Sequence, residues 1–558
     1  MKSKFLLLCI ISTSLITAIK AQSPTIAWQK TYGGTKNDSL ICISTTNDGG
    51  FIVSGFSNSD ISSNKTQNSY GGSYDFWILK LNDRGRIQWD KTLGGFGKDD
   101  NPVVMQAPDG GYLVGGRSMS DISGNKTENA FNGSADYWVI KLDKDGLVQW
   151  NNTVGNIQLE GVQAMANMPE KGTNYMIAGY SYSGYGNDKT DENRGANLWA
   201  DYWIVKLDGR GKIKFDKTIG GKNEDFVTCM KLNKDSTYVL GGYSYSPAGY
   251  QKTDSFKGNN DFWVYKMDAL GNRIWDHVYG GALSDYQTSI DQTSDGGFIM
   301  GGYSNSPASF DKSGPFKGVT DYWVIRTDAN GIKKWDKTLG GSLGDYLTCL
   351  IQTSDKGFLL GGYSSSGISG DKTENSKGGD DIWLVKLDST GKTIWNKTFG
   401  GSGSDRLSSL KEIAAGQYIL GGTSNSPVSG DKTDATVGGT GANDYWIMKV
   451  TATPTPPAVA VVDESTDAVA VQAPQELTRL SLQAAPNPTK GLVNLTYSGT
   501  KDAISLIVYN NTGKVVKKAN LSAGSTNYQL DISKEAAGTY YVVINCKTSS
   551  ATRVVIKQ

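Results

Sequence analysis

Residues 201–221 read DYWIVKLDGRGKIKFDKTIGG, and this stretch decides the fold. Large apolar residues alternate with polar ones in DYWIVKLD and again in GKIKFDKTIGG, with a turn from Asp208 to Gly211 between the two halves. Alternation with a period of two, interrupted by a short turn that contains glycine, is typical of a β-hairpin. We therefore predict two antiparallel strands joined by a tight turn.

The same hairpin recurs throughout the chain. Its second half, W-x-K-T-x-G-G with some variation, is spaced by 61, 61, 65, 60, 60 and 60 residues and begins at Trp28, Trp89, Trp150, Phe215, Trp275, Trp335 and Trp395. Its first half, Asp-x-Trp, begins at Asp75, Asp136, Asp201, Asp261, Asp321, Asp381 and Asp444. Each repeat contains two further short strands, such as 285–293 and 297–302. Such repeats without a helical period predict an all-β fold, a seven-bladed β-propeller over residues 24–450.

The two ends of this repeat array should meet. A short hairpin normally stays within one sheet, so each Asp-x-Trp strand should pair with the W-x-K-T strand that follows it. The first W-x-K-T strand and the last Asp-x-Trp strand then lack partners, and unpaired edges are unfavourable. We predict that residues 26–32 pair with residues 445–451 and close the ring.

Composition excludes several classes of function. The chain has 56 Lys and Arg against 55 Asp and Glu, so it offers no basic face for nucleic acid and no polybasic membrane patch. We find no zinc, EF-hand or P-loop motif, and we expect no cofactor and no metal. The single histidine, His277, replaces the Lys of W-x-K-T and is interpreted as an ordinary strand residue. We expect a monomer.

The N-terminus is typical of an export signal. Lys2 and Lys4 precede a largely apolar run over residues 5–19, and Ala21 ends a plausible signal peptide of residues 1–21. No other segment is long and apolar enough to predict a transmembrane span. Cys42, Cys229 and Cys349 occupy one equivalent position in three repeats, too far apart to bridge, and Cys546 lies in another domain; we predict no disulfide.

The pattern changes after residue 450. Residues 451–476 are rich in Thr, Pro and Ala and predict an extended linker, and short strands return in residues 477–558. The landmarks of this tail, in order, are Pro486, Asn487 and Pro488 with Gly491, then Gly513 and Lys514, then Gly538 and Tyr540, and Lys557 in the last strand.

With these landmarks the tail resembles the type A C-terminal sorting domain of the Bacteroidetes type IX secretion system. The resemblance implies a small immunoglobulin-like β-sandwich of seven strands that binds the outer-membrane translocon. It also implies export by Sec to the periplasm and then across the outer membrane, to the medium or the cell surface. The repeats loosely resemble kelch-like propellers, but no functional residue follows from that.

Features that recur in every repeat are interpreted as scaffold. The acidic residues of G-G-x-x-x-D are Asp38, Asp225, Asp285, Asp345 and Asp405. A long loop that follows the fourth strand also recurs, with S-x-S and then D/N-K-T/S; its Lys is expected to be solvated or ion-paired. A catalytic carboxylate pair should break the symmetry, and these residues do not.

Aromatic residues do break the symmetry. The loops of repeats 3 and 4 contain Tyr182, Tyr185, Trp199, Tyr245 and Tyr250, which adjacent blades would place on one sector of one face. Exposed aromatics stack on sugar rings or anchor protein partners, although they can instead pack loops against the blades.

These features favour an exported binding protein for a polysaccharide or a protein, with no catalytic residues. One alternative is a secreted glycoside hydrolase or lyase that uses carboxylates in the central channel. A second alternative is a structural or adhesive surface component.

Overall fold

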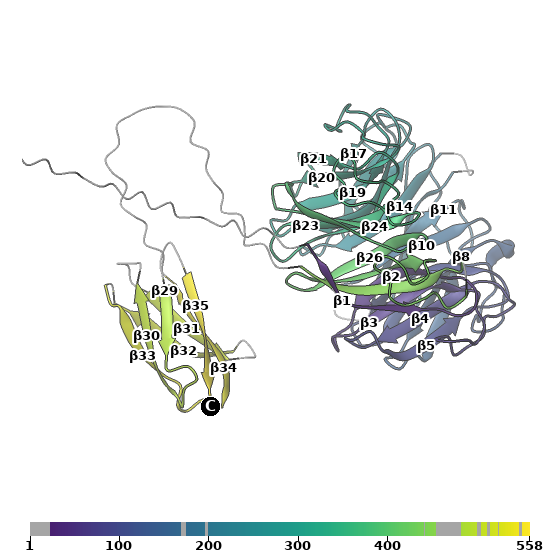
Figure 1. Cartoon of the computed structure of the whole chain (residues 1–558). Helices are drawn as coiled ribbons and strands as arrows, with labels where there is room; N and C mark the ends of the chain where they lie inside the picture. The colour runs from purple at the N-terminus through teal and green to yellow at the C-terminus, as the bar shows by residue number, and fades with distance from the viewer. Residues whose placement is uncertain are drawn as a thin grey trace, which may run out of the picture. The chain divides into compact units, whose positions relative to one another are not determined.

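The computed structural model describes residues 23–168, 174–195, 199–439, 441–452, 481–498, 504–510, 514–522, 524–545 and 550–558. The chain forms two compact units, residues 1–460 and 461–558, and each is considered by itself (Figure 1). The predicted signal peptide and residues 453–476 of the predicted linker lie outside the described residues. In the part that is described, no helix is long and apolar enough to cross a membrane; the helix there is the 3₁₀ turn η1 (Phe131–Gly133).

The first unit consists of seven four-stranded antiparallel sheets, called blades 1 to 7. The innermost strands are β2 (Asp38–Thr45), β6 (Asp99–Gln106), β10 (Glu160–Asn167), β14 (Asp225–Leu232), β18 (Asp285–Gln292), β22 (Asp345–Gln352) and β26 (Asp405–Ala414). The second strands are β3 (Phe51–Ser57), β7 (Tyr112–Ser118), β11 (Tyr175–Ser181), β15 (Tyr238–Ser244), β19 (Phe298–Ser304), β23 (Phe358–Ser364) and β27 (Gln417–Ser424).

The third and outermost strands correspond to the two halves of the repeated hairpin. The third strands are β4 (Asp75–Leu81), β8 (Asp136–Leu142), β12 (Asp201–Leu207), β16 (Asp261–Met267), β20 (Asp321–Thr327), β24 (Asp381–Leu387) and β28 (Asp444–Thr451). The outermost strands are β5 (Ile87–Leu93), β9 (Val148–Val154), β13 (Ile213–Ile219), β17 (Arg273–Tyr279), β21 (Lys333–Leu339), β25 (Thr393–Phe399) and β1 (Thr25–Tyr32).

The blades form a closed ring. Each innermost strand contacts the innermost strand of the next blade, from β2 through β6, β10, β14, β18, β22 and β26 and back to β2. A cycle of four-stranded sheets whose inner strands meet is the arrangement of a propeller. The predicted all-β, propeller-like fold of repeated four-stranded sheets is therefore confirmed.

Both ends of the unit build blade 7. Strand β1 pairs antiparallel with β28, from Thr25 opposite Thr451 to Tyr32 opposite Tyr445, and the sheet order is β1-β28-β27-β26. The predicted pairing of residues 26–32 with 445–451 is confirmed. Gln29 reinforces it, because its Oε1 accepts a hydrogen bond from the Trp446 indole nitrogen at 2.9 Å.

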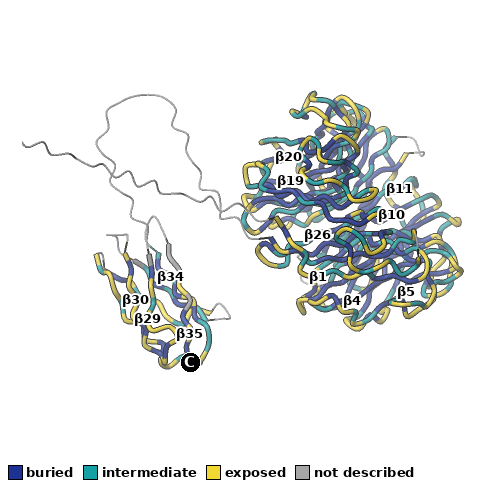
Figure 2. Tube along the Cα trace, viewed as in Figure 1, coloured by how far each residue is buried: buried dark blue, intermediate teal, exposed yellow. Residues whose placement is uncertain are grey.

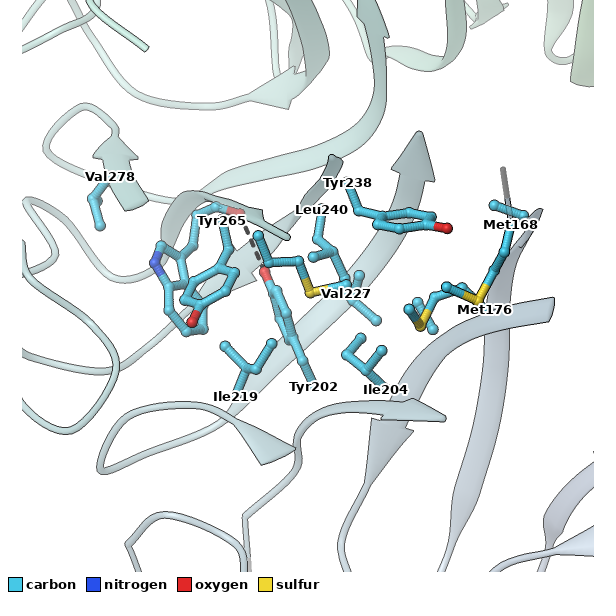
Figure 3. Packing of buried hydrophobic residues seen from close by; sticks show 14 residues of the cluster. Met168, Met176, Tyr202, Ile204, Ile219, Val227, Tyr238, Leu240, Tyr265 and Val278 are labelled. Carbon is cyan, nitrogen blue, oxygen red and sulfur yellow. Dashed lines mark hydrogen bonds between the residues drawn. The ribbon is translucent and has the colours of Figure 1, made fainter. Parts of the chain in front are cut away.

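The apolar core lies between neighbouring blades, and the buried stretches in Figure 2 follow the central strands. Figure 3 shows one cluster, in which residues of blade 3 such as Tyr202 and Ile204 pack against Leu240 and Tyr265 of blade 4. The Tyr202 ring lies 4.9 Å from Trp263, centre to centre, and its hydroxyl donates to the Trp263 carbonyl oxygen at 3.2 Å. Equivalent contacts join Tyr137 to Trp203, Tyr322 to Trp383 and Tyr445 to Trp77. The Asp-Tyr-Trp motif is thus an interblade contact.

The second unit has two antiparallel sheets that enclose one core. One sheet contains β29 (Ser481–Ala485), β30 (Leu492–Ser498) and β33 (Asn527–Asp531); the other contains β32 (Val515–Leu521), β31 (Ile504–Asn510), β34 (Gly538–Asn545) and β35 (Ser550–Lys557). Buried side chains of both sheets, including Val493, Leu495, Leu506 and Val542, form a single cluster. These seven strands agree with the predicted small β-sandwich.

The closing blade suggests a first test. Gln29→Ala removes the acceptor of the Trp446 indole N–H, and Trp446 is buried. A buried donor left without a partner costs about 1–3 kcal/mol, so the free energy of unfolding should fall by that amount in denaturant titration. Lys30→Ala, a change of the exposed neighbouring residue, is the control. Equal stability of the two variants would contradict this role of Gln29.

Candidate functional site

An arc of aromatic side chains runs along one side of the ring, on the first and second strands of successive blades. We call it the tyrosine arc. Its members, in contact order, are Tyr180, Phe226, Tyr243, Tyr286, Tyr303, Tyr346 and Tyr363. Neighbouring ring centres are 5.0 to 5.3 Å apart. The arc therefore forms a continuous aromatic wall from blade 3 to blade 6.

The contacts in the arc alternate between two geometries. Within a blade the rings stack, as in Tyr286 with Tyr303 at an interplanar angle of 27° and Tyr346 with Tyr363 at 23°. Between blades they meet edge to face, as in Tyr303 with Tyr346 at 70°. Both are favourable aromatic geometries. Burial raises the pKa of Tyr303 to about 12, so its hydroxyl remains a hydrogen-bond donor at neutral pH.

Arg406 of β26 ends the arc in blade 7. Its guanidinium carbon lies 5.0 Å from the centre of the Tyr363 ring, within cation–π distance, and its side chain forms an ion pair with Asp380 at 2.6 Å. Two partners hold this exposed arginine in one orientation beside the arc.

A cavity of about 600 Å³ opens where the arc ends. We call it the central cavity, because the innermost strands of blades 6, 7 and 1 form much of its wall, together with residues of two second strands and of adjoining loops. Aromatic, cationic, amide and hydroxyl groups line it, namely those of Tyr363, Arg406, Asn425, Asn443, Thr423 and Ser39. Ligand pockets in proteins are typically about 300–1,000 Å³ and carry a few polar groups of this kind. The central cavity therefore has the size and chemistry of a ligand site.

Blade 2 carries charged groups at the strand positions that aromatics occupy in the arc. Arg117 binds Asp100 through two hydrogen bonds of 2.7 Å, and Lys98 binds the same carboxylate at 2.7 Å. Burial acts to raise the pKa of Asp100, but the hydrogen bonds from Arg117 and Lys98 outweigh it and hold the pKa below its usual value. Because Asp100 is held charged by two cations, it is a structural ion pair and is not suited to exchange protons with a substrate.

Two of the predicted site residues adjoin the arc. The Tyr182 ring lies 6.3 Å from Phe226, and the Tyr245 ring lies 6.3 Å from Tyr243. Phe226 and Tyr243 contact each other, so these four rings form one connected group. Each of the two predicted residues is partly buried, and the Tyr182 hydroxyl also donates to Glu224 at 3.2 Å. Tyr182 and Tyr245 therefore lie at the edge of the arc, and part of each side chain packs against the arc's rings.

The other three predicted residues are in exposed loops. Tyr185, Trp199 and Tyr250 are 70%, 42% and 66% exposed, and over the described ranges no ring contact connects them to the arc. Tyr185 occupies a loop position that is apolar in all seven blades. Tyr250 has a positive φ of 53°, as does every residue at its equivalent position. The positions of Tyr185 and Tyr250 are therefore regular features of all seven repeats, although the sequence suggested that they were special to repeats 3 and 4.

Sequence reasoning missed the centre of the arc. Tyr243, Tyr303 and Tyr363 each follow a Gly-Gly pair at the end of a second strand, and Tyr286 and Tyr346 each follow the first Asp of an innermost strand. The available signal was that both positions hold aromatics in blades 4 to 6, whereas blades 1 and 3 have one aromatic each, Phe56 and Tyr180. Blades 2 and 7 have none there, with Asp100, Arg117, Arg406 and Thr423 instead. The pairing of the first and second strands is what places these two positions side by side, as it does for Tyr286 and Tyr303.

The residues considered for catalysis have other roles. Asp38, Asp225, Asp285, Asp345 and Asp405 are fully buried, so no substrate reaches them in this structure. The lysines of the long loops are at most 2% exposed; the expectation of a solvated lysine was wrong, because these side chains extend inward beside buried carboxyls. His277 lies on β17 with Nε2 3.0 Å from the Asn330 carbonyl oxygen.

Most of the predicted sorting-signal residues stabilise the second unit. Asn487 accepts a hydrogen bond from the backbone of Ile556, and the Lys557 ammonium donates to the carbonyl oxygens of Ser533 and Glu535. Tyr540 is buried and donates to the Ala536 carbonyl oxygen at 2.6 Å.

The remaining landmarks are placed as follows. Gly491 has a φ of 133°, and a Cβ there would lie 2.5 Å from the Cα of Ser533. Gly538 is the first residue of β34, Lys514 directly precedes β32, and Gly513 lies outside the described residues. Pro486 and Pro488 are exposed and line a cavity of about 470 Å³ together with Leu492, Lys490 and the terminal Gln558.

Residues 483–558 match the family model of the secretion system C-terminal sorting domain. The second unit is therefore a type IX sorting domain, and the chain is a cargo exported across the outer membrane to the cell surface or the medium.

Other known proteins are similar to this chain to a lesser degree. The regulatory protein FlaEY of Caulobacter vibrioides is 26% identical over 228 residues, 38% of this chain and 24% of that protein. The chain thus spans about a quarter of this relative.

Three solved structures resemble the chain more distantly. The Pan2 WD40 domain of Neurospora crassa has a TM-score of 0.38 at 8% identity, covering 74% of this chain and 89% of that one. Puromycin hydrolase has a TM-score of 0.42 at 12% sequence identity, and the match covers 83% of this chain and 59% of that one. A Dyadobacter fermentans protein of unknown function has a TM-score of 0.39 at 9% identity, and the match covers 77% of this chain and 99% of that one. Likeness at these scores supports no statement about activity.

The cysteines allow a test of the inner strands. Cys42, Cys229 and Cys349 are free thiols in three different blades. Burial of the sulfur raises the pKa of Cys229 and Cys349 to about 12, although each residue is exposed in part. Since the thiolate is the reactive form, both residues should resist iodoacetamide at pH 8 in the native protein and react after unfolding. Peptide mass spectrometry measures this; rapid native labelling would contradict the structure.

The sorting domain allows a second test. Lys557→Ala removes the donor to two carbonyl groups and should destabilise the domain by about 1–3 kcal/mol. Hydrogen exchange of residues 481–558 in the full chain should become faster, and export should decrease. Lys490→Ala, a change of an exposed lysine in the same unit, should alter neither. If exchange is unchanged but export falls, Lys557 acts in recognition instead.

Proposed function

We propose that this exported protein binds a polysaccharide at the central cavity and the tyrosine arc beside it. The observation that carries the proposal is the asymmetry of the ring. Among seven similar repeats, only blades 3 to 6 join their aromatic rings into one continuous series of contacts, whereas blade 1 has Phe56 alone at these positions. The arc leads into a cavity that contains Arg406, two amides and several hydroxyls. Hydroxyl-rich ligands suit a site with many hydrogen-bonding groups and an apolar wall.

The charges near the site also favour binding over catalysis. Asp100 is paired with Arg117 and Lys98, and Asp380 is paired with Arg406. The carboxylates that recur around the ring are buried. A glycoside hydrolase needs two accessible carboxyl groups on either side of the scissile bond, and the cavity lining contains none. The hydrolase alternative is therefore the less supported one.

A protein ligand is the second candidate, and a separate observation favours it. The loop position of Tyr185 is apolar and exposed in every blade, and its larger residues are 60% to 70% exposed: Ile61, Ile122, Tyr185, Ile368 and Val428. Exposed apolar side chains that recur on one face are typical of protein interaction surfaces. An adhesive role would use this ring of loops, whereas the polysaccharide would use the central cavity.

The test compares variants of the two surfaces. Arg406→Ala changes an exposed residue of the cavity and Tyr363→Ala removes the ring beside it; each should weaken polysaccharide binding at least tenfold in affinity electrophoresis. Tyr250→Ala, a change of an exposed loop residue away from the cavity, is the matched control and should bind normally. Unchanged binding by Arg406→Ala would reject the cavity as the site. Absence of binding by the wild type across a broad polysaccharide panel would reject the polysaccharide.

A further inference from the structure

Two acidic residues lie near each other at every junction between blades, so that the charge of one raises the pKa of the other, and at two junctions their side chains are within hydrogen-bond reach. One opens the third strand of a blade, and the other opens the innermost strand of the next blade. The seven pairs are Asp75–Asp99, Asp136–Glu160, Asp201–Asp225, Asp261–Asp285, Asp321–Asp345, Asp381–Asp405 and Asp444–Asp38. All fourteen side chains are 0% exposed. Burying two carboxylates together is very unfavourable unless other groups compensate them.

The junction that closes the ring shows what compensates the pair in part. Asp38 Oδ2 accepts hydrogen bonds from the Gly34 backbone at 2.7 Å and from Ser59 Oγ at 3.2 Å. Asp444 Oδ2 accepts one from the Val437 backbone at 2.5 Å. The second oxygen of each carboxyl, Oδ1, is fully enclosed. A hydrogen bond from the Ser57 side chain lowers the pKa of Asp38, whereas Asp444 Oδ1 has no donor.

This lack of a donor recurs. The seven aspartates that open the third strands each have a buried Oδ1 without a partner. Most acids of the innermost strands have a serine of the second strand beside them, which lowers the pKa of Asp38, Asp99, Asp225, Asp285 and Asp345 and donates to Glu160 at 2.9 Å. Little free space remains at the junction, because a Cβ on Gly33 would lie 1.8 Å from Asp444 Oδ1. Facing acceptors without a donor repel each other, whereas a carboxyl that keeps its proton donates to its neighbour.

Buried lysines complete the ring of charge. Each blade contributes one from its long loop, at most 2% exposed: Lys65, Lys126, Lys189, Lys252, Lys312, Lys372 and Lys432. Each lysine interacts with acidic residues of two junctions, as Lys65 does with Asp38 and Asp75. Fourteen carboxyls and seven lysines balance if each pair keeps one proton. A divalent cation at each junction would instead leave one net positive charge per blade.

We propose that each junction between blades holds one shared proton, in a hydrogen bond between a carboxyl and a carboxylate, and that losing these protons loosens the ring. The proton supplies the donor that Oδ1 of each third-strand aspartate lacks and makes the buried ring neutral. The junctions would thereby act as a pH-sensitive device built into the repeat, separate from the central cavity.

The direction of the pH dependence follows from burial. Burial, and then the charge of Asp38, raises the pKa of Asp444 to about 7, and burial raises the pKa of Asp75 to about 8. The charged groups that face the Asp38–Asp444 pair are Lys65 and Lys432, and the buried Tyr445 hydroxyl lies next to it.

The sign of the stability change depends on where each state releases its proton. In the unfolded chain an aspartate loses its proton near pH 4, so only the native state holds the shared protons between about pH 4 and native pKa values that range from about 6 at Asp321 to about 8 at Asp75. Their contribution to the free energy of unfolding is full below about pH 4 and is lost as the pH rises through about 6 to 8. Burial lowers the pKa of Lys65 to about 8, which acts in the opposite direction only above that pH. The window from pH 5 to 8 therefore isolates the carboxyl pairs.

Infrared spectroscopy of the full chain tests the protons directly. At pH 6 the native wild type should show the C=O band of protonated carboxyl groups, which exposed aspartates lack at this pH, and the band should be lost on unfolding. Absence of the band would overturn the proposal. So would elemental analysis that finds about seven tightly bound divalent cations per chain.

Denaturant titration from pH 5 to 8 tests the consequence. Each proton bound only in the native state makes the unfolding constant rise tenfold per pH unit. Asp444→Asn supplies an amide donor in place of the proton, so this rise should be about tenfold smaller per pH unit than in the wild type. Asp136→Asn is the second variant, should the closing junction not tolerate the change.

The matched control for these variants is Asp276→Asn. Asp276 is also buried, but it accepts from Trp263 and Thr253, and two blades have Asn at its position. The unfolding constant of Asp276→Asn should change with pH as that of the wild type does. If Asp444→Asn and Asp136→Asn retain the wild-type slope as well, no shared proton is present.

Discussion

The junction between adjacent blades is the constraint on which the rest of the first unit depends. Each junction must bury the ends of two strands, and the chain fills this space with an acidic pair, a serine hydroxyl, a glycine N–H and a lysine. The first glycine of each Gly-Gly pair is required because a Cβ at Gly33, Gly94 or Gly220 would collide with the neighbouring aspartate oxygen. The second supplies an N–H to the other carboxyl, as Gly34 does to Asp38. Motifs that are distant in sequence thus form one polar cluster.

The outer part of the junction is apolar and equally specific. The tryptophan of Asp-Tyr-Trp is buried in every blade, and its indole N–H is satisfied within the blade, as in Trp77 with Asp90. The preceding tyrosine packs on the tryptophan of the next blade and bonds to its carbonyl oxygen, as Tyr322 does to Trp383. The polar cluster and the aromatic contacts therefore join the same two adjacent blades. Together they set the position of each blade relative to the next. Strands β1 and β28 extend this rule to the two ends of the unit.

Because the junctions use the repeated residues, function is left to positions that the junctions do not constrain. The tyrosine arc lies at such positions: the residue after Asp on the innermost strand and the residue before Ser on the second strand. Blade 2 fills them with Asp100 and Arg117, and blade 7 with Arg406 and Thr423, and in both blades these two residues remain paired across the strands. The fold therefore tolerates variation there, and a ligand surface can differ from blade to blade.

The sequence by itself determined the hairpins, the number of repeats, the closing pair of strands and the sorting domain, because these follow from local alternation, turns and spacing. Only the tertiary structure decided which residues meet. Tyr182 and Tyr245 were predicted from their loops, but the central rings Tyr286 and Tyr346 were not, because their neighbours come from strands of other blades. The pairing of Asp38 with Asp444, far apart in the chain, and the burial of Lys65 likewise require the closed ring. Contacts between blades depend on how sheets pack, and a local pattern contains no information on that.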